Sequence, residues 1–96
     1  MIKLSKRLET VASYISDNVK LVDIGCDHGL LDIYLAKNRK NITIIASDIN
    51  ENALNNAISN IKKYKLEDII DYRVSNGLNN INKDEIDTIV ISGMGA

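Results

Sequence analysis

Residues that could take part in chemistry cluster in the stretch VDIGCDHGLL, residues 22–31. Asp23, Gly25, Asp27 and His28 follow an apolar run there, so a glycine turn also carries carboxylates. The dinucleotide fingerprint G-x-G-x-x-G would need its second glycine at the position of Asp27. A carboxylate that faces a pyrophosphate is unfavourable, because like charges repel where water is partly excluded. The turn therefore disfavours NAD, and the chain also lacks the G-x-x-x-x-G-K-[ST] loop of nucleotide hydrolases.

S-adenosylmethionine fits the charge of this turn better, because it carries a sulfonium and an ammonium group and no phosphate. Gly25 lets the backbone come close to a ligand. Asp48 stands roughly twenty residues further on, where an acidic side chain accepts hydrogen bonds from ribose hydroxyls in sheets of this kind. Asn76 could donate to and accept from an adenine edge. These residues predict an S-adenosylmethionine site.

Each candidate in the turn also has a purely structural explanation. Gly25 and Gly29 could serve a strand-to-helix turn alone, and Asp27 could be the N-cap of the helix that follows. An isolated histidine such as His28 more often has a structural or solvent-facing role. Cys26 is expected to pack as a small apolar residue.

The spacing of apolar side chains predicts the elements that must position these residues. A helix is expected from the N-cap Ser5 to about residue 17, since apolar residues recur there at helical spacing. Two more helices are expected, one after the glycine turn and one from residue 54 toward Lys65. Strands are expected at residues 20–24, 41–46, 70–74 and 86–91.

Strands that alternate with helical segments indicate an α/β fold with βαβ units, a parallel sheet and helices on both faces. In such sheets, ligands bind beyond the carboxyl ends of the strands. This rule brings together the loops at residues 25–29, 47–50 and 75–78, with the loop at Gly93 as their neighbour. The candidate residues should therefore share one edge of the sheet.

Composition limits the class of protein. A chain of 96 residues with 45% hydrophobic and 26% charged residues indicates one small globular domain. The formal net charge of -1 gives no overall basic field, so composition alone does not suggest a nucleic acid partner. One cysteine and one histidine supply neither an internal disulfide nor a zinc site, and no metal is expected. No apolar run is long enough to span a bilayer and no signal segment is recognisable, which favours a cytoplasmic protein without a membrane partner.

Several segments together resemble the bacterial tRNA (adenine(22)-N(1))-methyltransferase family. They are LSKRLETVASYI at 4–15, VDIGCDHGLLDIYL at 22–35, ASDIN at 46–50, SNGL at 75–78 and DTIVISGMGA at 87–96. The resemblance covers essentially the whole chain, and its motifs in this order are more specific than a glycine loop. It implies a Rossmann-like class I methyltransferase that uses S-adenosylmethionine to methylate N1 of an adenine in tRNA.

The same resemblance implies contacts residue by residue. Asp23, Gly25, Asp27 and His28 would lie at the methionine side of the cofactor, Asp48 and Ile49 at its ribose, Asn76 and Gly77 at its adenine, and Gly93 and Met94 below the target base. Asp27 is the candidate catalytic residue, since a carboxylate could stabilise positive charge that develops on the adenine ring. No N/D-P-P-Y/F/W motif follows the last predicted strand, which argues against methylation of an exocyclic amino group. One departure lies at Leu30, Leu31 and Asp32, where family members often have an aromatic residue followed by Leu-Pro.

The lysines at positions 62, 63 and 65 allow two interpretations. They resemble a patch that faces tRNA, but lysines in the last turn of a helix also complement the helix dipole, which is the interpretation that we favour.

Family members continue past the position of Gly93-Met94-Gly95 and carry a helical domain. We therefore expect residues 1–96 to be the N-terminal part of the S-adenosylmethionine-binding domain, truncated after the fourth strand, with the C-terminal helical domain absent. Such a chain should have no methyltransferase activity alone, and it should self-associate through its open fourth strand or be only marginally stable. Two alternatives remain: a small-molecule methyltransferase of the same fold, and a non-catalytic module that binds S-adenosylmethionine.

Overall fold

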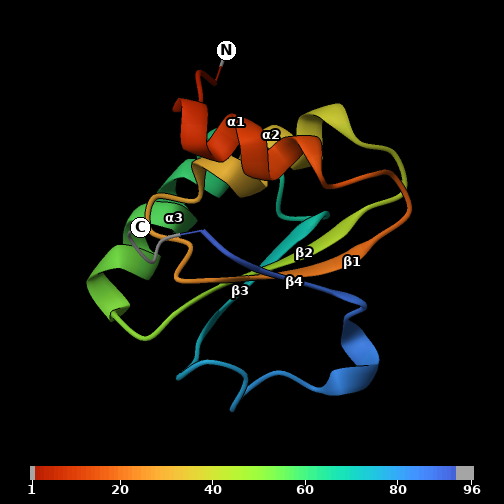
Figure 1. Cartoon of the computed structure of the whole chain (residues 1–96). Helices are drawn as coiled ribbons and strands as arrows, with labels where there is room; N and C mark the ends of the chain where they lie inside the picture. The colour runs from red at the N-terminus through yellow and green to blue at the C-terminus, as the bar shows by residue number, and fades with distance from the viewer. Residues whose placement is uncertain (1, 93–96) are drawn as a thin grey trace.

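The computed structural model describes residues 2–92 of the chain (Figure 1). Its elements are α1 (Lys6–Ser13), β1 (Lys20–Ile24), α2 (Leu30–Asn38), β2 (Thr43–Asp48), α3 (Glu51–Lys63), β3 (Ile70–Val74), the short 3-10 helix η1 (Lys83–Glu85) and β4 (Thr88–Ile91). The predicted alternation of strands and helices is confirmed. Within residues 2–92, no helix combines the length and the apolar character that crossing a membrane requires.

The strands form one parallel sheet in the order β3-β2-β1-β4. β1 is internal, and its Val22 lies between Ile45 of β2 and Ile89 of β4. The chain builds the sheet outward from β1 to β3 and then crosses back to place β4 on the other side of β1. The strand order therefore reverses between β1 and β4, and the crevice beyond their carboxyl ends is the place where such sheets bind ligands.

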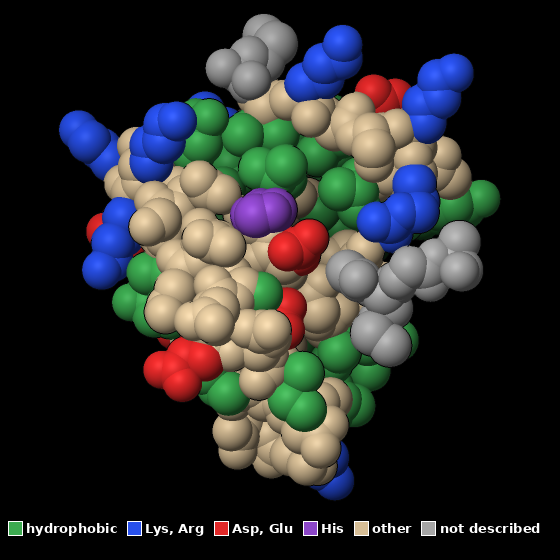
Figure 2. All heavy atoms as spheres, turned by 90° about the vertical axis from the view of Figure 1, so that its left-hand side faces the viewer, with side chains coloured by type: hydrophobic (Ala, Val, Ile, Leu, Met, Phe, Trp, Pro, Cys, Tyr) green, Lys and Arg blue, Asp and Glu red, His purple; other side chains and the backbone are tan. Residues whose placement is uncertain are grey.

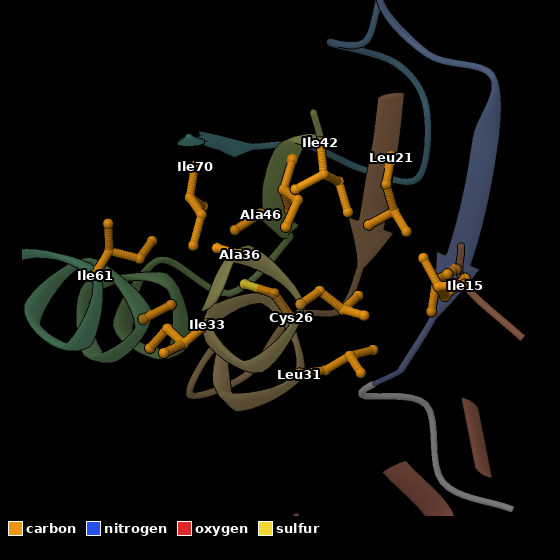
Figure 3. Close-up of a cluster of buried hydrophobic side chains, with 14 of the residues drawn as sticks. Ile15, Leu21, Cys26, Leu31, Ile33, Ala36, Ile42, Ala46, Ile61 and Ile70 are labelled. Atoms are coloured by element: carbon orange, nitrogen blue, oxygen red, sulfur yellow. The ribbon is translucent and has the colours of Figure 1, made fainter. Parts of the chain in front are cut away.

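An aliphatic core fills the space between the sheet and the helices α1, α2 and α3 (Figure 3). Leu21 and Ile44 project into it from the strands, while Ile33 and Leu35 of α2 and Ile61 of α3 meet them, all at most 1% exposed. The chain has no Phe or Trp, so branched aliphatic side chains supply the volume of this core. Their burial fixes α2 and α3 against the sheet and sets where the loops at its edge begin.

The opposite face of the sheet differs from the expectation of helices on both faces. α1, α2 and α3 lie above the sheet in Figure 1, while the connection from β3 to β4, with η1, lies below it. Ile89 and Ile91 of β4 remain 52% and 57% exposed. The physical reason is that β1-α2-β2 and β2-α3-β3 cross over in the same direction, and right-handed crossovers in one direction put their helices on one face. The parallel α/β class is confirmed, but in residues 2–92 the α-helices cover a single face.

The end of α1 is set by a contact that is distant in sequence. Ser5 is its N-cap as predicted, but the helix ends at Ser13 rather than near residue 17. Arg39 donates from Nη2 to the carbonyl oxygen of Ala12 (2.9 Å) and from Nε to that of Ile15 (2.6 Å). These bonds satisfy carbonyl groups that a longer helix would have used.

The other boundaries move by small amounts. β2 continues past residue 46 to Asp48, because Asp48 pairs with Val74 of β3. α3 ends at Lys63, and Lys65 has a left-handed backbone (φ 58°) that a helix cannot continue. β4 begins at Thr88 rather than at residue 86.

Candidate cofactor and catalytic site

The loops that follow β1, β2 and β3 meet at the carboxyl edge of the sheet, as the sequence predicts. The Cys26 N–H donates to the carbonyl oxygen of Ser47 (2.9 Å), and the Ser75 N–H donates to that of Asp48 (3.0 Å). Figure 2 looks at this edge and shows acidic side chains near its middle, with Lys and Arg side chains mostly around the rim. The backbone therefore joins the candidate residues into one site.

The glycine turn after β1 has a strained, tightly bonded backbone. Gly25 (φ 72°), Asp27 (φ 53°) and Gly29 (φ 73°) all lie in the left-handed region. The Gly29 N–H donates to the carbonyl oxygen of Cys26 (2.8 Å) and closes the turn. Gly29 is also the N-cap of α2, without a side-chain cap, so the interpretation of Asp27 as the N-cap is wrong. Positive φ is uncommon for residues other than glycine, so the surrounding bonds hold Asp27 in this conformation.

Asp48, at the end of β2, has a carboxylate that two backbone N–H groups orient. Its Oδ2 accepts from the Asp27 N–H (3.2 Å), and its Oδ1 accepts from the Asn50 N–H (2.9 Å). Each carboxylate oxygen has a further lone pair, so the partly buried group can still accept one hydroxyl on each oxygen. This geometry suits the two neighbouring hydroxyls of a ribose.

The remaining candidates of the second and third loops lie around Asp48. Ile49 follows it directly and is 66% exposed, which offers an apolar surface to a base or a sugar. Asn76 is exposed in the loop after β3. The Ser75 hydroxyl donates to the carbonyl oxygen of Gly77 (2.8 Å) and so fixes the loop that carries Asn76.

Asp23 lies inside the fold rather than on the surface of the turn. Its side chain is fully buried, and its Oδ1 accepts from the Ser92 N–H (3.3 Å) and from the Ser92 hydroxyl (2.5 Å). Asp23 lies two residues after Leu21 on β1, so both side chains project from the face that the helices cover. Asp23 therefore stabilises the end of β4 through its bonds with Ser92. Its contact with the methionine side of a cofactor stays a prediction.

The Asp27 and His28 side chains are open to solvent, with 64% and 56% exposure and 3.8 Å between Oδ1 and Nε2. The Asn60 amide of α3 donates to the carbonyl oxygen of His28 (2.8 Å) and holds the turn from behind. Because the Asp27 N–H also bonds Asp48, the candidate catalytic carboxylate adjoins the candidate ribose acceptor. A ligand on Asp48 would have Asp27 within reach.

A small cavity of about 90 Å³ opens beside the turn. It is lined by Arg7, Leu8, Cys26, Asp27, His28, Leu30, Leu31 and Ser92. Arg7 donates from Nη1 to the carbonyl oxygen of Ser92 (2.7 Å) and thus joins α1 to the end of β4. Pockets for whole ligands are typically several hundred Å³, so the cavity forms only a corner of a larger site.

Three residues at this edge had no role in the sequence-based prediction. Arg7 and Ser92 are 85 positions apart, and no local pattern connects them, although Arg7 lies in the segment at residues 4–15 that carries part of the family resemblance. Asp32 did carry a signal, because an acidic residue interrupts the apolar stretch of α2, and buried carboxyls are rare unless they are paired.

Two further sequence-based interpretations concern Cys26 and the lysines at the end of α3. Cys26 is 4% exposed within the aliphatic core, as predicted. Lys62 and Lys63 lie in the last turn of α3, where the helix-dipole interpretation places them, and both are exposed, so a patch that faces tRNA stays a prediction. The predicted contacts of Gly93 and Met94 lie outside the described residues.

Replacing Gly29 with alanine should lower the free energy of unfolding by about 1–3 kcal/mol. The new Cβ would take a positive φ and would lie 3.2 Å from the Cβ of Ala57. Gly77→Ala is a matched control, since φ is +60° there but no atom lies within 4 Å of the added Cβ. Urea denaturation should show the larger loss for Gly29→Ala, and equal losses would mean that the contact with Ala57 is unimportant.

A parallel sheet of this order, with a glycine turn after β1 and an oriented carboxylate after β2, is the arrangement of a Rossmann-like domain. The family model described as "Methyltransferase domain" matches residues 4–96, and the chain belongs to that family.

Curated relatives and solved structures agree with the predicted resemblance. "Putative tRNA methyltransferase MG248" of Mycoplasma genitalium is 45% identical in an alignment 96 residues long, which covers 96% of this chain and 43% of that protein. "tRNA (adenine(22)-N(1))-methyltransferase" of Bacillus subtilis is 42% identical over 94 residues, or 98% of this chain and 40% of that protein. A crystal structure of Streptococcus pneumoniae Sp1610, a putative tRNA (m1A22) methyltransferase in complex with S-adenosyl-L-methionine, matches with a TM-score of 0.87 and 37% identity over 97% of this chain and 44% of that one. The chain thus spans less than half the length of these proteins.

Proposed function

We propose that residues 1–96 are the N-terminal, methyl-donor-binding part of an S-adenosylmethionine-dependent tRNA (adenine-N1)-methyltransferase. The observation that carries this proposal is the Asp48 carboxylate, which the N–H groups of Asp27 and Asn50 orient at the carboxyl end of β2. The names of the relatives from Mycoplasma genitalium and Bacillus subtilis support tRNA as the substrate.

The charges at this edge suit a cofactor without phosphate. Asp27 is largely exposed, and Asp48 is partly buried beside it. Two carboxylates would repel a pyrophosphate, whereas they attract the positive groups of S-adenosylmethionine. When it is bound, this cofactor supplies an electrophilic methyl group. Asp48 would hold its ribose, with Ile49 and Asn76 beside the nucleoside.

The residues of the chain would act mainly by orientation. N1 of adenine is unprotonated at neutral pH, so its lone pair needs no strong base. Holding two reactants in the correct geometry can by itself supply a large part of a rate enhancement. The Asp27 carboxylate could in addition stabilise positive charge that develops on the adenine ring.

Replacing Asp27 with asparagine in the full-length protein should therefore reduce the methylation rate more than it weakens cofactor binding. We expect a single-turnover rate on tRNA at least about tenfold lower, because a charge that stabilises the transition state is lost. Asp84→Asn is a matched control, since Asp84 is an exposed carboxylate of η1, on the other face of the sheet. Equal losses of rate and affinity would make Asp27 a binding residue only.

The domain organisation and the location of the protein are part of the same proposal. We propose that the full-length protein continues beyond residue 96 with the remaining strands of the sheet and a helical domain that contributes to tRNA binding. It would act in the cytoplasm, where tRNA is found. Sequencing the gene beyond codon 96 tests this organisation directly, and a stop codon there would contradict it.

A further inference from the structure

Two carboxyl groups face each other inside the fold. Asp23 on β1 and Asp32 in the first turn of α2 are both fully buried. Of their four oxygens, only Oδ1 of Asp23 has a hydrogen-bond donor from another residue, and that residue is Ser92. Oδ2 of Asp23 and both oxygens of Asp32 accept no such bond from the described residues. Buried oxygens without a donor are costly, so a bond between the two carboxyls is the available remedy.

A single shared proton provides that bond. Two ionised carboxylates in contact repel each other strongly, so one of the two retains its proton. Burial raises the pKa of Asp32 well above its ordinary value, and the charge of Asp23 and the hydrogen bond to it raise it further. Burial also raises the pKa of Asp23, but bonds from Asp32 and Ser92 oppose that rise. The proton therefore resides on Asp32, which donates to the Asp23 carboxylate.

Among residues 2–92, no cationic side chain is paired with these carboxyls and could replace the proton. Asp48 adds negative charge near Asp23, and the thiol of Cys26 stays neutral because burial raises its pKa. Arg7 donates to the Ser92 carbonyl oxygen, and within residues 2–92 no Lys, Arg or His forms an ion pair with either carboxyl. The amino end of α2 favours the one negative charge that the pair retains.

We propose that Asp32 is a positioning residue: it holds the proton that it shares with Asp23, and the Asp23 carboxylate thereby anchors Ser92 at the end of β4. Ser92 is then held from two sides, by Asp23 at its N–H and hydroxyl and by Arg7 at its carbonyl oxygen. The anchor lies where the strand order reverses, beside the cavity next to the glycine turn. The proton and the anchor follow from the fold alone, and only their importance for catalysis rests on the proposed function.

The shared proton has a spectroscopic and a thermodynamic signature. At neutral pH, infrared spectra of the wild-type protein should contain a protonated carboxyl band that Asp32→Asn lacks. The folded protein keeps this proton above pH 3.8, the ordinary pKa of the side chain, whereas the unfolded chain releases it. The stabilising uptake of the proton is thus complete at low pH and is lost as the pH rises toward the pKa of folded Asp32. Over that window, the unfolding constant of the wild type should rise by up to tenfold per pH unit relative to Asp32→Asn.

The positioning role has its own measurement. Asparagine at position 32 can still donate to Asp23, so Asp32→Asn should keep the Ser92 amide protected from hydrogen exchange. Asp32→Leu removes the donor, and we expect exchange at Ser92 to accelerate about tenfold, while the distant Ile70 amide, bonded to Leu66, does not change. If Asp32→Leu does not fold, the proposal is still tested by comparing the infrared band and the pH dependence of the wild type with those of Asp32→Asn.

Two outcomes would overturn the proposal. One is a wild-type protein without the protonated carboxyl band, or with the same pH dependence as Asp32→Asn. The other is unchanged exchange at Ser92 in folded Asp32→Leu. None of these measurements involves methyl transfer, so a failure of the proposed function would be seen separately.

Discussion

Replacing Asp48 with alanine is expected to weaken binding of S-adenosylmethionine by about 1.5–3 kcal/mol, the range for hydrogen bonds to a charged group. This corresponds to a roughly 10- to 150-fold higher Kd. Two backbone N–H groups already orient the Asp48 carboxylate, so its remaining lone pairs are placed for the ribose hydroxyls before the ligand arrives. Titration calorimetry on the purified full-length protein measures the effect.

Two further variants separate ligand binding from loss of charge. Asp68→Ala removes the same charge from an exposed position before β3, at the opposite end of the sheet, and should leave the Kd unchanged. Asp48→Asn keeps one oxygen acceptor and should give an intermediate loss. Unchanged affinity in a folded Asp48→Ala variant would remove Asp48 from the site.

The strands were easier to predict from the sequence than the helix ends. The strands at residues 20–24 and 70–74 have the predicted bounds, because local patterns define them: the first is a short buried segment, and in the second Ile70, Tyr72 and Val74 alternate with polar residues. The end of α1 depends instead on Arg39, which lies 27 positions from Ala12 and reaches it only in the folded chain. A periodic pattern carries no information about such a contact.

The site divides in the same way. The meeting of Asp27 and Asp48 could be predicted, because parallel strands bring their following loops to one edge. The burial of Asp23 could not, since it depends on β4 crossing back beside β1, which makes β1 internal and brings Ser92 onto the carboxyl. The bond between Arg7 and Ser92 requires β4 to cross back beside β1, which alternation alone does not establish.

The outer edge of β4 is the feature with the largest consequence for the 96-residue chain itself. β4 pairs only with β1 among the described residues, so its other edge presents unpaired N–H and C=O groups. Ile89 and Ile91 are more than half exposed beside that edge. An open apolar strand of this kind is a template for pairing with another chain.

We therefore expect the purified 96-residue chain to self-associate through β4 and to transfer no methyl group to tRNA. Light scattering should give a mass that rises with concentration above the 10.7 kDa of the monomer. Ile89→Lys should restore the monomer, because a charge beside an open edge opposes strand pairing. Tyr14→Lys places the same charge at an 83% exposed position on α1 and should leave association unchanged. A stable monomer at all concentrations would contradict pairing through β4, and measurable methyl transfer would show that the chain needs no further domain for catalysis.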